Sequence, residues 1–200
     1  MIKQDYIMKM IEQFVNALAK ILFNKEAGNY KEAINDIEGT LNNLVGVDHF
    51  LINTLSGKDI ISLLNITKDS KKANIQCIII AKLLKEKAEL NSLSKKDKSI
   101  PDIDYQKSLS LFLEGILNYK ADDIDLSKYY NDVNEIVHRI NDSKISKDTR
   151  FKLFKYYEQL GEYKKAGIEL NKLKNIDFLG IENEEIQFHR KLNEQKAEET

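Results

Sequence analysis

Two segments far apart in the chain have nearly the same sequence, and they constrain the fold more than any other feature. The first is EAGNYKEA at residues 26–33 and the second is QLGEYKKA at residues 159–166. Helix-periodic apolar residues precede and follow each segment. Glycine accepts the left-handed conformation that ends a helix, tyrosine begins the next helix, and alanine lets the two helices approach closely. The pattern predicts two tight helix–turn–helix units with the turn residues Gly28, Tyr30, Ala33, Gly161, Tyr163 and Ala166.

Apolar residues also recur at helical spacing along most of the remaining chain, and no segment shows the alternation of a β-strand. The spacing predicts a long helix with two apolar faces after Lys71, and another helix that has the sole proline, Pro101, in its first turn. Asp48, Ser56 and Ser146 are candidate helix starts. The fold class is therefore predicted to be all-α.

The length favours one helical domain over residues 1–200. Helical hairpins are expected at about 3–45, 71–120 and 147–174, and the last helix is expected to fray at about 195–200.

The segment from Phe151 to Leu173 resembles a tetratricopeptide unit, with large, small and turn residues at the positions that this family uses. The segment from Phe14 to Leu41 is similar to it, and the helix pair from Lys71 to Tyr119 could be a third unit. The matching residues are Leu153, Tyr157, Gly161, Tyr163, Ala166 and Leu170 in the first case and Gly28, Tyr30, Ala33 and Ile37 in the second. The resemblance implies stacked antiparallel hairpins and protein–protein interaction rather than chemistry.

The chain departs from the tetratricopeptide pattern because no unit ends in proline and the spacing between units is irregular. A short, irregular superhelix and a compact bundle therefore both remain open. The opening of the chain (IKQDYIM at 2–8, IEQ at 11–13 and LAKIL at 18–22) is similar to an uncharacterised family of small bacterial helical proteins. That resemblance implies the same helical fold and no known activity.

Composition and charge restrict where the protein acts. The formal net charge of −1 provides no overall attraction for nucleic acid or an anionic membrane, and there are only three arginines. The single cysteine, Cys77, lies among isoleucines, which predicts a buried thiol in a reducing cytosol. The longest apolar run, 77–81, is too short for a membrane span, and Asp5 is atypical of a signal peptide. We expect a cytoplasmic, bacterial protein without nucleic-acid or membrane partners.

No residue pattern indicates a catalytic, cofactor-binding or metal site. The three histidines, His49, His138 and His189, are too far apart in the sequence for a local zinc motif. The acidic cluster Asp122, Asp123 and Asp125 lacks the glycine of a calcium loop and is better explained as a helix N-cap. There is no glycine-rich phosphate loop and no nucleophile elbow.

Charge and aromatic residues indicate two further features. Residues 68–98 contain nine lysines against four acids, and residues 101–142 contain nine acids against four cations. These segments either neutralise each other within the fold or present a basic face to an acidic partner. Four tyrosines form adjacent pairs, and adjacent helical residues point about 100° apart, so one of each pair should lie at the edge of the buried stripe. The tentative interaction surface is Tyr129, Tyr130, Tyr156 and Tyr157.

Two functions remain open from the sequence. The first is a non-enzymatic protein-interaction module whose protein partner is unknown. The second is a small-ligand sensor or enzyme whose site is assembled from distant residues, with an apolar gap between the first helix pair and the central helices. Self-association is a further hypothesis, since apolar residues outside the main stripe of the first helix have to be buried either against the rest of the chain or against a second copy in a symmetric homodimer. These residues are Tyr6, Met8, Val15 and Phe23.

Overall fold

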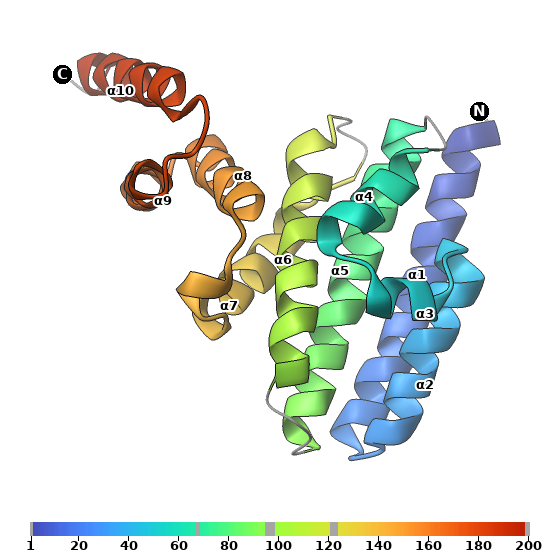
Figure 1. The fold of residues 1–200 in the computed structure, drawn as a ribbon. Coiled ribbons are helices and arrows are strands. Elements are labelled where there is room, and N and C mark those ends of the chain that lie inside the picture. The colour runs from blue at the N-terminus through green and yellow to red at the C-terminus, as the bar shows by residue number, and fades with distance from the viewer. Residues whose placement is uncertain (1, 67–68, 95–98, 121–123, 199–200) are drawn as a thin grey trace. The chain divides into compact units, whose positions relative to one another are not determined.

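The computed structural model describes residues 2–66, 69–94, 99–120 and 124–198 (Figure 1). These residues contain helices and turns and no β-strand, which confirms the all-α prediction for this part of the chain. The chain divides into two compact units, Met1–Lys144 and Ile145–Thr200. The single domain over residues 1–200 stays a prediction.

The first unit is built from two long hairpins with shorter helices packed around them (Figure 1). One hairpin is α1 with α2, the other is α5 with α6, and α2 and α1 both contact α5. The elements in chain order are α1 (Ile2–Glu26), α2 (Tyr30–Thr40), the π-helical turn η1 (Leu41–Val45), α3 (His49–Thr54), α4 (Gly57–Asn65), α5 (Ser70–Leu93), α6 (Ser99–Asn118), the 3-10 turn η2 (Ser127–Tyr129), α7 (Tyr130–Arg139) and the 3-10 turn η3 (Asp142–Lys144).

Helix α5 is the centre of the first unit. Its residues are buried on several sides because α1, α2, α4, α6 and α7 all contact it. Cys77 is among these buried residues, as predicted. At Gly115 of α6, a Cβ would lie 2.6 Å from Cδ1 of Ile78, so glycine is required for the close approach of α5 and α6.

The predicted helix starts are present. The Asp48 side chain accepts a hydrogen bond from the Phe50 backbone N–H at 2.8 Å, and Ser56 forms a capping box with Asp59. Helix α6 begins at Ser99, which places Pro101 in its first turn. Asp125 accepts a hydrogen bond from the Ser127 N–H at 2.8 Å and begins η2. The predicted capping residues Asp122 and Asp123 lie outside the described residues.

The second unit consists of α8 (Lys147–Gln159), α9 (Tyr163–Asn175) and α10 (Ile181–Glu198). The Ser146 side chain caps α8 by accepting a hydrogen bond from the Thr149 N–H at 3.2 Å. Helix α10 packs through the buried Phe188, whose ring centroid lies 5.7 Å from that of Phe154. The sequence predicts that this helix frays from about residue 195, but α10 continues to Glu198. Among the described helices of the whole chain, none combines the length and apolarity that a membrane crossing requires.

Candidate functional site

The two predicted turns have nearly the same geometry. Gly28 and Gly161 have φ of +78° and +71°, in the left-handed region that glycine adopts most readily. The residues that follow, Asn29 and Glu162, have φ, ψ of −80°, 57° and −80°, 58°. Tyr30 and Tyr163 begin α2 and α9, and both following alanines, Ala33 and Ala166, are fully buried. The turn signal in the sequence therefore specifies the same backbone twice.

Hydrogen bonds close each turn in the same pattern. The Asn29 N–H donates to the Asn24 carbonyl at 2.8 Å, and the Glu162 N–H donates to the Tyr157 carbonyl at 2.9 Å. Each glycine N–H donates to the carbonyl three residues earlier, at 3.2 Å in both cases. These are the two bonds of a Schellman motif, which satisfies the last carbonyls of the helix.

The predicted tyrosine surface is only partly supported. Tyr156 and Tyr157 are both buried, so the prediction that this pair contributes an exposed surface is wrong. The physical reason is that buried residues cover roughly 200° of α8 at 100° per residue, which includes both members of the pair. Tyr129 and Tyr130 are partly exposed, and the Tyr129 ring lies 5.7 Å from that of Phe112. Burial raises the pKa of Tyr129 to about 12.

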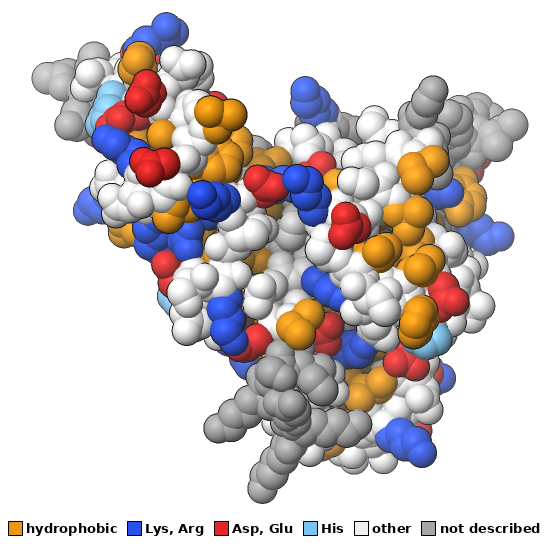
Figure 2. Space-filling model, in the orientation of Figure 1, with side chains coloured by type: hydrophobic (Ala, Val, Ile, Leu, Met, Phe, Trp, Pro, Cys, Tyr) orange, Lys and Arg blue, Asp and Glu red, His pale blue; other side chains and the backbone are white. Residues whose placement is uncertain are grey.

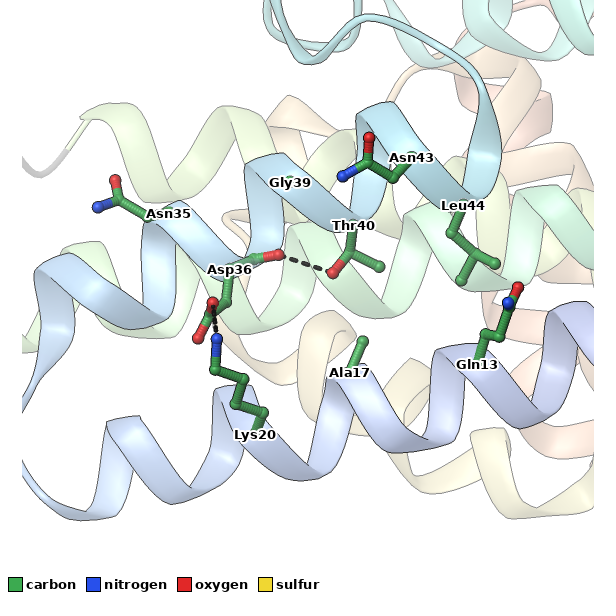
Figure 3. Close-up of a pocket in the computed structure, with 9 residues that line it drawn as sticks. All are labelled: Gln13, Ala17, Lys20, Asn35, Asp36, Gly39, Thr40, Asn43 and Leu44. Carbon is green, nitrogen blue, oxygen red and sulfur yellow. Dashed lines mark hydrogen bonds and ion pairs between the residues drawn. The ribbon is translucent and has the colours of Figure 1, made fainter.

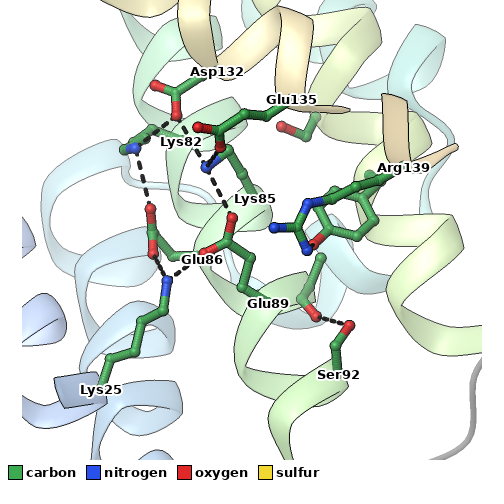
Figure 4. A network of polar contacts seen from close by, with 12 residues as sticks. Lys25, Lys82, Lys85, Glu86, Glu89, Ser92, Asp132, Glu135 and Arg139 are labelled. Carbon is green, nitrogen blue, oxygen red and sulfur yellow. Dashed lines mark hydrogen bonds and ion pairs between the residues drawn. The ribbon is translucent and has the colours of Figure 1, made fainter. Parts of the chain in front are cut away.

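Opposite charges from three helices form a network on one side of α5 (Figure 4). Lys82 lies 2.8 Å from Asp132 and 3.1 Å from Glu86, while Lys85 lies 2.7 Å from Glu135. Lysines of the basic segment thus pair with acids of the following acidic segment, which confirms that the two segments neutralise each other at these positions. Lys25, at the end of α1, joins the network at Glu86 and Glu89 and ties the first hairpin to α5.

Two central groups of this network, Lys85 and Glu89, are held in their charged forms. Burial would raise the pKa of Glu89, but hydrogen bonds from Lys25 and Lys85 lower it to about 2. Burial opposes the charge of Lys85, while hydrogen bonds from Glu135 and Glu89 raise the pKa of this lysine above its ordinary value. Both groups therefore remain ionised near neutral pH and offer no proton for general acid–base chemistry.

The described residues contain no cluster of histidine, cysteine and acidic side chains that could hold a metal ion. His49 and His189 are exposed at least in part, and each lies within 4.0 Å of a carboxylate.

One buried acid is unusual: Oδ2 of Asp104 has no hydrogen-bond partner among the described residues, and burial raises the pKa of this carboxyl group. The nearby Lys107 Nζ donates to the Ile52 and Asn53 carbonyls, at 2.9 and 2.7 Å, and so caps α3.

Helix α1 has exposed apolar side chains on the side away from its buried stripe, where the exposed Ala19 and Glu12 also lie. Ile7, Met10, Phe14 and Ile21 form its buried stripe. Met8 and Val15 are each 50% exposed and Phe23 is 69% exposed, and at 100° per residue these three lie within roughly 80° of one another. We call them the open face of α1. Tyr6 is 51% exposed but does not belong to the open face: at 100° per residue it lies on another side of α1, and Lys72 Nζ is 5.1 Å from its ring centroid. The sequence predicts that these four residues are buried against the rest of the chain or against a second copy, and the described chain leaves each of them at least half exposed.

A second exposed apolar area lies on α3. Figure 2 shows hydrophobic side chains grouped over α3 and α4 on the visible face of the first unit, and Phe50 and Leu51 of α3 are exposed. This area comprises one turn of a short helix, so it is less extensive along the chain than the open face of α1.

A polar groove of about 430 Å³ lies between α1 and α2 (Figure 3). At one end Lys20 Nζ reaches across to Asp36 Oδ1 at 2.6 Å, and Asn24 Nδ2 donates to the other carboxylate oxygen at 2.9 Å. Gln13 and Leu44 lie at the other end. The lining residues are Gln13, Ala17, Lys20, Asn35, Asp36, Gly39, Thr40, Asn43 and Leu44.

The groove was missed by sequence reasoning, although Gly39 carries a signal. It lies inside α2, where glycine is less favourable than alanine by about 1 kcal/mol, and a Cβ there would meet no atom within 4 Å. Neither close packing nor a left-handed backbone explains this glycine. The helix then continues as the π-helical turn η1, which carries Asn43 and Leu44 into the groove wall. Such turns are rare and frequent at functional sites.

Comparison with known proteins gives no further guidance: no protein-family model, no curated protein and no solved structure matches this chain.

Proposed function

We propose that this chain is a non-enzymatic protein-interaction module of the helical-repeat type, and that it contacts its partner through the open face of α1. The observation that carries the proposal is the exposure of Met8, Val15 and Phe23 on a helix whose opposite side is fully buried. Exposed apolar residues that share one face of a helix are typical of interaction surfaces.

The helical architecture supports this function. Hairpins α1–α2 and α8–α9 share one turn geometry, as repeated helical units do. Stacked helical hairpins expose an apolar face at an end unless another element covers it. The open face of α1 is an uncovered apolar surface of this kind among the described residues. In the ion pairs of α5 the opposite charges compensate each other. Nothing in this network therefore favours catalysis over binding.

The partner is either another protein or a second copy of this chain in a symmetric homodimer, and two measurements separate them. Sedimentation equilibrium over a wide concentration range detects the homodimer against the 23.2 kDa monomer. Affinity capture from the native host, with wild type and Phe23→Glu in parallel, detects another protein. Gln187→Glu is the control, because it adds the same charge at an exposed position of α10.

We expect one of the two assays to detect a partner that wild type and Gln187→Glu bind and Phe23→Glu does not. The reason is that a charge buried in an apolar contact has to be desolvated. A strictly monomeric chain whose captured proteins are the same for all three variants contradicts the proposal.

A further inference from the structure

We infer that the groove between α1 and α2 binds an extended, uncharged segment of a partner protein by hydrogen bonds to its main chain. This inference rests on the proposed interaction function and adds a second contact surface on α1. Lys20 and Gln13 of the groove and Phe23 of the open face belong to the same helix.

The dimensions of the groove suit a short extended segment. Its α1 wall runs from Gln13 to Lys20, and seven residues of helix at 1.5 Å each span roughly 10 Å. An extended chain advances about 3.3 Å per residue, so about three residues fit along this wall. A volume of about 430 Å³ is also in the range of ligand sites in proteins.

Amide side chains supply the hydrogen-bonding groups that a peptide main chain requires. The exposed side chains of Gln13, Asn35 and Asn43 line the groove, and their amide groups make no hydrogen bond to another described residue. Each amide offers an oxygen acceptor and two N–H donors. A peptide unit presents one N–H and one C=O, so a single amide side chain can pair with both.

The charge balance of the groove selects against charged ligands. Lys20 and Asp36 are the charged residues that line it, and they neutralise each other at 2.6 Å. The Asp36 carboxylate also accepts from Asn24, which leaves it little capacity for a cationic ligand. Ala17 and Leu44 add apolar wall, which suits a small apolar side chain in the bound segment.

Gly39 of α2 has no packing role among the described residues. A Cβ there would meet no atom within 4 Å, so glycine leaves space open beside the groove where almost any other residue would fill it. The π-helical turn η1 that follows is itself well packed, because Leu41 and Val45 are buried and Gln76 Nε2 donates to the Val45 carbonyl at 2.9 Å. Access of a ligand main chain to the groove accounts for the helix-interior glycine, which is less favourable than alanine in a helix.

The test uses a phage-displayed library of random twelve-residue peptides, selected on the full wild-type chain. The affinity of each selected peptide is then measured for wild type, Gly39→Leu and Lys31→Leu. Gly39→Leu fills the open space of the groove, while Lys31→Leu adds the same side chain to an exposed position of α2 outside it. Thermal melting of both variants verifies that they fold.

We expect peptides that bind wild type and Lys31→Leu equally and Gly39→Leu at least about tenfold more weakly, which corresponds to about 1.4 kcal/mol. N-methylation of the central peptide bonds should cause a similar loss, because it removes main-chain N–H groups and leaves the side chains in place. The inference is overturned if no peptide is selected, if Gly39→Leu binds as wild type does, or if N-methylation has no effect.

The two proposals can fail separately. Phe23→Glu reports on the open face of α1 and should not change the affinity of groove-binding peptides. Gly39→Leu reports on the groove, and a partner captured through Phe23 but insensitive to Gly39→Leu overturns the groove inference alone.

Discussion

Hairpins α1–α2 and α8–α9 have the same turn but differently filled interiors. When the chain is aligned on Gly28 and Gly161, Ala17 corresponds to Arg150 and Asp36 to Glu169. In α8–α9 these positions form a buried ion pair, with Arg150 Nη1 2.7 Å from Glu169 Oε2 and both side chains less than 10% exposed. In α1–α2 the short Ala17 cannot reach Asp36, and the groove lies between them.

The difference shows that the turn determines how a hairpin begins but not how its helices pack farther along. The first four residues after each glycine follow nearly the same path, and both alanines are fully buried. Eleven residues before each glycine, one hairpin has a methyl group and the other a guanidinium. Lys20 and Asn24 also differ from their counterparts, the buried Leu153 and Tyr157, so the side chains along the first helix of each hairpin determine how its interior is filled. The predictions below test whether the two hairpins differ in this way.

The largest expected effect is the loss of the buried pair in α8–α9. Arg150→Met leaves the Glu169 carboxylate buried without its arginine partner, although Lys172 stays 2.9 Å away. The free energy of unfolding of the second unit should therefore fall by about 3 kcal/mol. Urea denaturation measures the loss. Arg190→Met is the control, because its pair with Glu194 is exposed and should contribute less than about 1 kcal/mol. Equal effects of the two substitutions would show that the second hairpin is not filled by this pair.

The second prediction tests whether the turns are energetically as well as geometrically equivalent. Gly28→Val and Gly161→Val should each reduce stability by roughly 1–3 kcal/mol, because a β-branched residue is strained at positive φ. Steric clashes contribute little, since a Cβ at Gly28 meets nothing within 4 Å and at Gly161 only Cε2 of Tyr163, at 4.0 Å. Gly28→Asn should cost less, because asparagine tolerates this conformation. Unchanged melting temperatures for both valine variants would contradict the assignment of the turns.

The third prediction concerns how the first hairpin is attached to α5. The folded-state pKa of Glu89, about 2, is below its ordinary value of 4.5, so its contribution to stability is complete above pH 4.5 and is lost as the pH falls toward 2. We expect the first unit to lose on the order of 1–2 kcal/mol between pH 6 and pH 3 through this group. Glu89→Gln should flatten this part of the pH profile, whereas Glu12→Gln, at an exposed position of α1, should leave it unchanged. If the pH dependence of stability is the same for wild type, Glu89→Gln and Glu12→Gln, then Glu89 does not contribute to stability through this network.

Local signals predicted the helices and turns well. Gly28, Gly161 and the caps Asp48, Ser56 and Ser146 act on neighbouring residues, so their effect can be read from adjacent positions. The position of the open face of α1 was also predictable, because Met8, Val15 and Phe23 lie outside the main apolar stripe of a single helix.

Features that depend on two helices were not predicted. Predicting that Tyr156 and Tyr157 are both buried requires knowing how much of the surface of α8 other helices cover. The apolar stripe of a single helix does not give this information. The groove required knowing that Ala17 faces α2 near Gly39. It lies within the first hairpin, whereas the gap considered from the sequence is between that hairpin and the central helices. A glycine within a helical segment can be recognised in the sequence at Gly39. Its connection to a groove cannot, because that depends on the empty space beside it in the structure.

The smallest expected effect is a gain in stability at Gly39. Gly39→Ala should stabilise the first unit by about 0.5–1 kcal/mol, because alanine is the better helix former and its methyl group meets no atom within 4 Å. Lys172 is the corresponding residue of the second hairpin, where the interior is filled and the lysine pairs with Glu169 at 2.9 Å. Lys172→Ala should therefore have no stabilising effect and should cost a few tenths of a kcal/mol through the lost pair. Opposite signs for the two alanine substitutions are consistent with an open space at Gly39 and a paired side chain at Lys172, and urea denaturation at pH 7 measures both changes. A loss of stability in Gly39→Ala would mean that α2 is closer to α1 than the groove requires.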